Sequence, residues 1–560
     1  MFKRWLIIIS AIAITMFSLT GCKSGEFDIL IKNGTIVDGS GNSAYEADIG
    51  ITGDTIVEIG DLAGKTAVKT IDAKGLTVSP GFIDFHSHAD VELMRQSSER
   101  PKIMQGITTE VIGNCGMAVA PLSKHNLYPQ KEYVTSLLGS SEIEWSWSNL
   151  KQYFTQLEKR KIPVNVASYA AHGAIRVAVM GFDARKPTQE ELDKMKMLAV
   201  QAMKEGAVGL STGLIYPPGC YADIHELVEL CKVVAEYDGF YASHVRNESD
   251  KLIESLKEAI EIGKRANISV HISHFKISGR SNWSKIGQAL DLIHQAKTEG
   301  IDITCDQYPY TAGSTTLTAL LPQWVLAGGL EASLRRLSNA STRRRIRREL
   351  HQDIPRWDNL AKTTGWDSIV ISLVNTEKNK IFEGKSIAKI AELREKDPAD
   401  VLFDLLTEEK GSVIMVVFQG SEENVRRILQ EPTTMIGTDG IPRKGKPHPR
   451  LYGTFPRILG KYVREEKILS LEEAIHRMTF LPAKRLQFDN IGQIKKGNYA
   501  DITIFDRDSI TDKSTYDQPC QYPEGIEYVL VSGEISVKTG EYTGALPGRI
   551  LRKPSSDRNS

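Results

Sequence analysis

From Pro80 onward, short apolar runs alternate with longer segments in which apolar residues recur at helical spacing. The short runs are bounded by glycine and proline, which is typical of buried strands, and residues 252–266 form the clearest helical segment. Repeated strand–helix units place their strands in parallel. A series this long predicts a closed, TIM-like (β/α)8 barrel, an α/β fold.

The series contains nine candidate strands, one more than such a barrel holds. They lie at residues 81–85, 107–114, 164–169, 207–214, 239–245, 268–273, 301–305, 412–418 and 433–437. One of them is therefore either not a strand or part of an insertion. The segment 315–411 is too long for one strand–helix connection, rich in Arg and Lys, and largely helical in pattern. We expect it to form an inserted helical subdomain over the barrel mouth.

Both ends of the chain carry a different pattern, with short strands separated by turn residues. Residues 26–79 and 489–560 flank the barrel at 80–488, so we expect the two parts to complete one small β-sandwich domain. Within the first part, the Asn33-Gly34 dipeptide between alternating residues predicts a hairpin turn.

Side chains that can bind a metal stand at or near the carboxyl ends of several candidate strands. His86 and His88 point to the same side of one strand because they are two residues apart. Alone, such a pair is a weak signal, since two histidines at an exposed strand end look the same. In a barrel, however, the carboxyl ends of the strands converge on the face where active sites lie. The full set predicts a metal centre there: His86, His88, Cys115, His244, His274 and Asp439.

The bulk composition excludes some partners. Lys plus Arg and Asp plus Glu both number 70, so no overall charge attracts nucleic acid. The arginine-rich run 343–348 is better explained as a solvated helix face than as a phosphate site. After the first 22 residues, five cysteines remain. That odd number excludes a framework in which all of them pair as disulfides.

The N-terminus is typical of a targeting segment, with a charged start, an apolar run at residues 5–17 and small residues before Cys22. Residues 1–22 resemble a bacterial lipoprotein signal, which implies cleavage before Cys22 and a lipid on its thiol. The alternative is a membrane-spanning anchor, for which the apolar run is short. We expect an extracytoplasmic lipoprotein anchored to a membrane.

From Phe27 to the C-terminus the chain resembles the amidohydrolase superfamily, and within it the N-acyl-D-amino-acid deacylases, or D-aminoacylases. The resemblance rests on the motifs at residues 80–88, 105–109, 113–116, 209–214, 243–246, 272–276, 308–314, 437–440 and 448–456. Many relatives bridge their metals with a carbamylated lysine, whereas the D-aminoacylase branch uses a cysteine. Cys115 is therefore the discriminating residue.

The resemblance implies two zinc positions. Cys115, His244 and His274 correspond to the ligands of a tight site, and His86, His88 and Asp439 to those of a second, weaker one. A thiolate and two imidazoles leave zinc an open position, where it activates water at neutral pH. Asp439 would be the general base and acid, because a departing amine needs a proton. A purely structural ligand is the alternative role of Asp439.

The resemblance also suggests which residues bind the substrate. Arg450 can hold an α-carboxylate through two parallel hydrogen bonds. Tyr308, Tyr216 and Lys276 are further candidates, Ser314 is a weaker one, and His172 is better explained as a structural histidine. Packing alone would equally explain the tyrosines.

The predicted function is zinc-dependent hydrolysis of N-acyl-D-amino acids, small molecules, to a carboxylate and a free D-amino acid. The alternatives are a cyclic-amide hydrolase of the hydantoinase or dihydroorotase kind, and a non-catalytic solute-binding lipoprotein. Cys115 and Arg450 argue against the first alternative, and Asp439 argues against the second.

Overall fold

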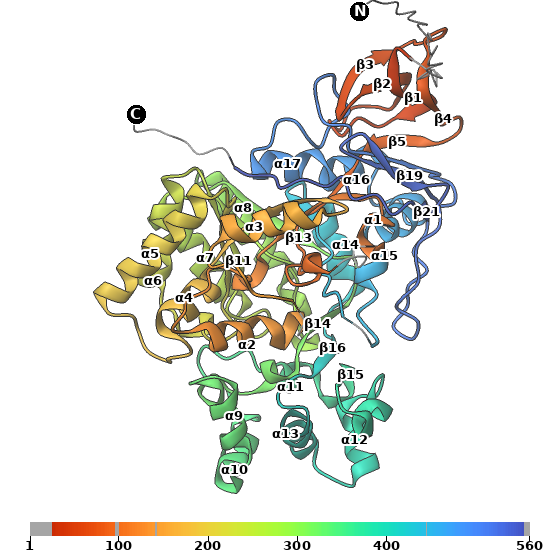
Figure 1. Ribbon diagram of the computed structural model, residues 1–560. Coiled ribbons are helices and arrows are strands. Elements are labelled where there is room, and N and C mark those ends of the chain that lie inside the picture. The colour runs from red at the N-terminus through yellow and green to blue at the C-terminus, as the bar shows by residue number, and fades with distance from the viewer. Residues whose placement is uncertain (1–24, 96–99, 140–142, 444, 554–560) are drawn as a thin grey trace, which may run out of the picture.

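The computed structural model describes residues 25–95, 100–139, 143–443 and 445–553. The expected signal segment and Cys22 lie outside these ranges. Figure 1 shows three bodies: a β-rich module at the N-terminal end, a central barrel with surrounding helices, and a smaller body on the opposite side of the barrel.

The central body is a parallel barrel. One ladder joins β6 (Phe82–Asp84), β7 (Ile107–Ile112) and β8 (Asn165–Ser168). After a single residue the chain continues in β9 (Ala170–Ala171), which begins the second ladder. That ladder contains β10 (Gly209–Gly213), β11 (Phe240–His244), β12 (Val270–Ile272), β13 (Ile303–Gln307) and β17 (Thr434–Ile436).

The barrel closes between its first and last strands. A parallel bridge joins Ser87 to Gly440, just beyond the ends of β6 and β17. In addition, the Asp439 amide donates to the carbonyl of His86 at 2.7 Å. With β8 and β9 counted as one strand, the two ladders together contain the eight strands that the sequence predicts.

Helices follow most barrel strands and bury one face against them. They include α4 (His172–Met180), α5 (Gln189–Lys204), α6 (Ile224–Ala235), α7 (Leu252–Ala266), α8 (Ile286–Thr298) and α14 (Glu422–Gln430). In α7 the buried residues Leu252, Leu256 and Ala259 recur at the spacing of one helix face. The N-cap of α5 is Thr188, which forms a capping box with Glu191.

The ninth candidate strand belongs to the insertion. β16 (Ile414–Phe418) pairs antiparallel with β14 (Ala312–Thr316) and β15 (Ile369–Leu373). Between these strands lie α9 (Leu330–Leu337), α10 (Ala340–Glu349), α11 (Leu360–Thr364), α12 (Ile387–Arg394) and α13 (Pro398–Glu408). The insertion is thus built on a small sheet rather than on helices alone. The helices pack on this sheet around a core of their own, in the lower body of Figure 1.

The β module is one nine-stranded sheet built from both chain ends. Its first part contains β1 (Phe27–Ile36), β2 (Tyr45–Thr52), β3 (Thr55–Gly60), β4 (Ala67–Asp72) and β5 (Thr77–Pro80). The second part contains β18 (Ile502–Phe505), β19 (Ile526–Val531), β20 (Glu534–Lys538) and β21 (Glu541–Tyr542). The antiparallel pairing of β5 with β18 joins the two parts.

Two details of the module differ from the sequence-based expectations. Asn33-Gly34 is a β-bulge within β1 and not a hairpin turn, because β1 continues along β2 on both sides of it. Asn33 has the positive φ of 60° that suits either feature. The end of the chain also leaves the module: Ile550 forms a bridge to Val166 in barrel strand β8.

Two further observations concern the expected export. None of the helices that the structure describes is both long and apolar enough to cross a bilayer. The five cysteines in the described ranges are all free: Cys115, Cys220, Cys231, Cys305 and Cys520.

Candidate metal centre

The ends of β6 and β7 position three of the candidate ligands. His86 and His88 follow β6, where the closing contacts to β17 hold the backbone. Cys115 follows β7 in a short 3-10 turn (Asn114–Gly116) and adopts a φ of 54°. Gly116 is required there, because a Cβ atom would lie 2.9 Å from the Gly213 amide nitrogen. The turn therefore aims the thiol into the barrel mouth.

Cys115 is the centre of a cluster of imidazoles. Its Sγ lies 3.4 Å from His86 Nε2, 3.4 Å from His274 Nε2 and 3.7 Å from His244 Nδ1. Zn–S and Zn–N bonds of about 2.3 and 2.1 Å in a tetrahedral site separate sulfur from nitrogen by roughly 3.6 Å. The observed spacing fits a zinc ion among these atoms.

A second cluster shares His86. Asp439 Oδ1 lies 3.2 Å from His88 Nε2 and 3.7 Å from His86 Nε2. These distances suit one metal ion bound by two imidazoles and a carboxylate. Because His86 belongs to both clusters, the two positions are adjacent.

The thiol and the carboxylate are held in their charged forms. Burial alone would raise the pKa of Cys115, but the surrounding His86 and His274 lower it well below its usual range. Burial likewise opposes ionisation of Asp439, whereas Arg450 and His86 hold its pKa well below the ordinary value. Anionic sulfur and oxygen are the forms that bind a divalent cation.

A buried carboxylate orients the ligands from β13. Asp306 Oδ2 lies 3.2 Å from His86 Nδ1 and 2.8 Å from His271 Nε2, and its other oxygen accepts from the amide of His274. A carboxylate behind the distal ring nitrogen fixes the tautomer and direction of a ligating histidine. Asp306 stands at a strand end in the sequence, which was the available signal for it.

Glu248 has the same role on the other side. Its Oε1 lies 3.1 Å from His274 Nδ1 and 2.6 Å from Lys276 Nζ, and its Oε2 lies 3.9 Å from His244 Nε2. Glu248 comes four residues after the end of β11, in a loop where no strand or helix pattern singles it out.

A third group of supporting residues is fully buried and comes from β6, β7, the segment before β7 and the loop after β17. Lys102 Nζ contacts Asp84 at 2.5 Å, Glu110 at 3.2 Å and Thr438 Oγ1 at 2.9 Å. Asp84 also accepts from the amide of Thr438 at 2.7 Å. This Lys102 cluster (Asp84, Lys102, Glu110 and Thr438) ties the strand that carries His86 to the loop that carries Asp439.

All five predicted substrate-binding residues line one cavity. Arg450, Lys276 and Tyr308 lie together: Arg450 lies over the Tyr308 ring at 4.5 Å from its centroid, and the Lys276 nitrogen is 5.7 Å from it. The hydroxyl of Tyr216 instead bonds Thr315 at 2.9 Å. Ser314 meets Arg450 Nη2 through its carbonyl at 3.3 Å.

Arg450 is the first residue of α15 (Arg450–Arg457). It is fully buried, and its Nη1 pairs with Asp439 Oδ2 at 2.9 Å. The Tyr308 hydroxyl is buried without a hydrogen-bond partner, as is Arg450 Nε. Buried polar atoms of this kind, gathered around one cavity, are suited to a polar ligand.

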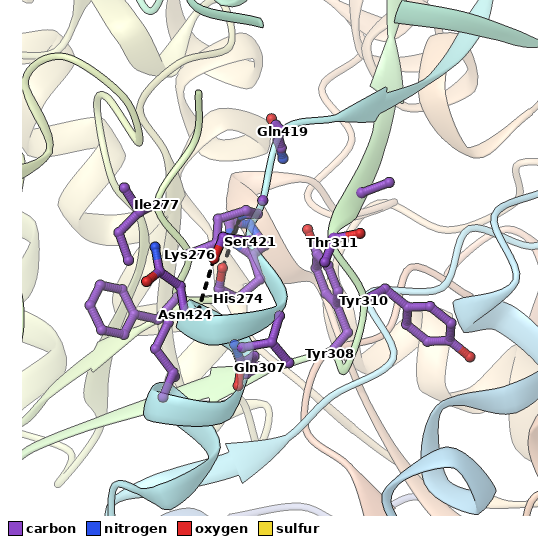
Figure 2. Close-up of a pocket in the computed structure, with 15 residues that line it drawn as sticks. His274, Lys276, Ile277, Gln307, Tyr308, Tyr310, Thr311, Gln419, Ser421 and Asn424 are labelled. Atoms are coloured by element: carbon purple, nitrogen blue, oxygen red, sulfur yellow. Dashed lines mark hydrogen bonds between the residues drawn. The ribbon is translucent and has the colours of Figure 1, made fainter. Parts of the chain in front are cut away.

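That cavity opens onto the metal centre, with Cys115, His274 and Asp439 in its lining. A neighbouring hollow shares His274, Lys276 and Tyr308 with it and reaches toward α14. Figure 2 shows these three side chains together with Gln419, which precedes α14, and Asn424, which lies in its first turn.

His172 is buried outside the cluster. Its Nε2 lies 2.8 Å from Glu226, which also pairs with Arg176. These contacts agree with a structural histidine at the start of α4.

Comparison with known proteins adds the following. Residues 69–537 match the amidohydrolase family. The D-aminoacylase of Alcaligenes xylosoxydans xylosoxydans is 35% identical over 95% of this chain and 99% of that protein. The N-acyl-D-glutamate deacylase of the same organism is 34% identical over 95% of this chain and 98% of that protein. Among solved structures, N-acyl-D-glutamate deacylase from Bordetella bronchiseptica, complexed with zinc and a phosphonate inhibitor, is similar with a TM-score of 0.79. The two sequences are 32% identical, and the match covers 94% of this chain and 99% of the Bordetella bronchiseptica chain.

Proposed function

The chain belongs to the amidohydrolase family, and on that premise we propose that it is a zinc-dependent N-acyl-D-amino-acid deacylase. It hydrolyses a linear amide to a carboxylate and a free D-amino acid. One observation carries the proposal: a buried arginine suited to a carboxylate lies 2.9 Å from a carboxylate that also faces the candidate metal ligands. The deacylase relatives, similar over nearly the whole chain, support the same reading.

Cys115, His244 and His274 would hold the tighter zinc, with His86, His88 and Asp439 around a second position. When bound, zinc supplies a Lewis acid for the amide carbonyl and for the attacking water. The distances within the clusters fit that ion. Because the ligands come from the ends of separate strands, the barrel pre-positions them before any metal binds.

Asp439 is suited to carry the proton. Its Oδ2 is committed to Arg450, and its Oδ1 faces the cavity beside His88. As the water oxygen attacks the carbonyl carbon, Asp439 accepts the proton that the water loses. It then gives that proton to the amide nitrogen while the C–N bond breaks, so that a neutral amine departs.

Arg450 and Tyr308 form the end of the cavity that would bind the α-carboxylate. Arg450 offers a planar pair of donors, and the unpartnered Tyr308 hydroxyl adds a third. Lys276, whose Nζ lies 5.7 Å from the centroid of the Tyr308 ring, adds positive charge near this end of the cavity. A carboxylate held there places the adjoining amide near Asp439.

The alternatives have less support. A hydantoin ring has no free α-carboxylate, so a hydantoinase does not need such an anchor beside the base. A solute-binding protein does not need Asp439 as a proton carrier. A D-aminoacylase and an N-acyl-D-glutamate deacylase are similar to this chain over nearly its whole length. This similarity supports a hydrolase of linear amides.

The enzyme is tested with residues 23–560, free of the signal segment, against N-acetyl D- and L-amino acids, with zinc measured in the same preparation. We expect hydrolysis of the D-enantiomers and about one tightly bound zinc per chain. A preparation loaded with zinc that cleaves no member of the panel would show that the proposed function is wrong.

We also propose that the protein is an extracytoplasmic lipoprotein attached through Cys22. The support is the sequence of the first 22 residues, with its charged start, apolar run and small residues before the cysteine. Lipid on this thiol would bring the enzyme to a membrane surface without a spanning helix.

A further inference from the structure

We propose that this enzyme prefers N-acyl-D-amino acids with uncharged side chains and discriminates against D-glutamate and D-aspartate derivatives. The inference rests on the proposed function and concerns the same cavity. It addresses a choice left open by the relatives, which include both a D-aminoacylase and a D-glutamate deacylase.

The lining of the cavity includes an aliphatic part, the wall, made of five side chains from separate parts of the fold: Leu137, Ile215, Leu360, Val417 and Ile441. Leu137 lies in the last turn of α2 (Leu127–Leu138), and Leu360 and Val417 come from the insertion. The barrel and the insertion therefore build this surface together. Ser314, Thr315 and Gln419, which also line the cavity, are neutral.

The cations of the cavity already have carboxylate partners. Among the described residues that line it, the cations other than histidine are Lys276 and Arg450. Lys276 pairs with Glu248 at 2.6 Å, and Arg450 pairs with Asp439 at 2.9 Å. The α-carboxylate common to all N-acyl-amino acids would take the donors that remain on these two cations. A side-chain carboxylate would then find no further Lys or Arg among the described lining residues, and aliphatic groups beside it.

The arginine nearest in sequence to this wall does not offer its charge to the cavity. Arg443 follows Ile441 by two residues, but its guanidinium turns toward the end of α2, where it donates to the carbonyl of Leu137 at 3.0 Å. It contacts the backbone behind Leu137 and is not part of the cavity lining.

An anion without a partner in a dehydrated site is strongly disfavoured, whereas an aliphatic side chain gains from contact with the same wall. A site that leaves the charge of a buried ligand group unpaired rejects that ligand strongly. A site that only loses the contact of one methylene group discriminates far less. We therefore expect charge, rather than size, to set the preference.

The experiment compares kcat/KM for N-acetyl-D-methionine, N-acetyl-D-glutamine and N-acetyl-D-glutamate on the zinc-loaded enzyme. Glutamine and glutamate have nearly the same shape, so their ratio isolates the charge. We expect N-acetyl-D-glutamate to be at least about 100-fold poorer than methionine and at least about tenfold poorer than glutamine. A glutamate value within tenfold of the glutamine value, or above it, would overturn the proposal. Failure to cleave any of the three would instead count against the proposed function itself.

A pair of variants tests the wall directly. Ile215 is half-buried, so a longer polar side chain can be accommodated there. Ile215→Arg should raise the glutamate-to-glutamine ratio at least about tenfold, and Ile215→Gln, the neutral control, should leave it unchanged. If Ile215→Arg still cleaves N-acetyl-D-methionine but keeps the wild-type ratio, the charge of the wall does not set specificity and the proposal is wrong.

Discussion

Arg450 Nη1 lies 2.9 Å from Asp439 Oδ2, and both side chains are buried. One guanidinium thus serves two partners: it keeps Asp439 ionised and offers its remaining donors to a ligand. Substrate binding and proton transfer are therefore coupled through one side chain. Replacing either residue should disturb both, and the size of each effect distinguishes their roles.

Replacing Arg450 with Lys should lower kcat/KM for N-acyl-D-amino acids by more than about tenfold, or roughly 1.4 kcal/mol. Lysine keeps the charge but cannot reproduce the planar pair of donors. The loss should shrink for the corresponding amino-acid amides, which lack the α-carboxylate. Steady-state kinetics on matched acids and amides measure both losses. Equal losses would mean that Arg450 acts through Asp439 alone, and the anchor would have to be Lys276.

Replacing Asp439 with Asn removes the basic carboxylate and nearly preserves its shape. Proton transfer by a positioned group typically contributes about 10²–10⁴-fold, so we expect kcat to fall by that range. Zinc at the Cys115 position should be largely retained, because Asp439 faces the other cluster. Metal analysis and kinetics on the same sample provide the check. A variant that raised KM and left kcat intact would make Asp439 a binding residue.

Replacing Cys115 with Ala should remove tight zinc and activity together. Its sulfur is the atom that approaches His86, His244 and His274, so its loss removes the one ligand that these three imidazoles surround. Dialysis against a chelator followed by zinc analysis is the measurement. Cys231→Ala is the matched control, because the Cys231 thiol is buried in a hydrophobic cluster and is not a candidate ligand. This variant should keep the tight zinc. A full equivalent of zinc and a normal rate in Cys115→Ala would refute the ligand assignment.

Sequence patterns predicted the barrel because strand and helix periods are local properties, and the comparisons confirm that fold. The six candidate ligands could be named for the same reason, since each stands near a strand end. Glu248 and Asp306 could not be assigned their roles, because a supporting carboxylate is defined by what it touches after folding. Asn33-Gly34 was interpreted wrongly because a turn and a bulge require the same positive φ.

Replacing Cys22 with Ala should leave the protein unprocessed or release it from membranes. The proposed anchor depends on this one thiol, and lipid chains on it would account for stable attachment. Palmitate labelling and membrane fractionation of cells that express the full chain measure the effect. Cys520→Ala, which alters an exposed cysteine far along the chain, is the control. Unchanged labelling of the Cys22→Ala protein would rule out the anchor.

Replacing Lys102 with Met tests whether the Lys102 cluster positions the metal ligands. The change leaves the carboxylates of Asp84 and Glu110 without their shared cation, and breaking a buried pair in this way costs about 3–5 kcal/mol. Since Asp84 binds the backbone at both His86 and Thr438, the distance between His86 and Asp439 should become less well fixed. We therefore expect a lower unfolding temperature and weaker metal binding at the His86, His88 and Asp439 position, with the Cys115 position less affected. Thermal unfolding and zinc titration separate these effects.

The double variant Lys102→Met with Asp84→Asn is the control, because it also removes the negative charge of Asp84. It should recover part of the stability but not the metal affinity, because the hydrogen bonds of Asp84 are also changed. Full metal affinity in Lys102→Met, despite a lower unfolding temperature, would show that the cluster stabilises the barrel without positioning the site.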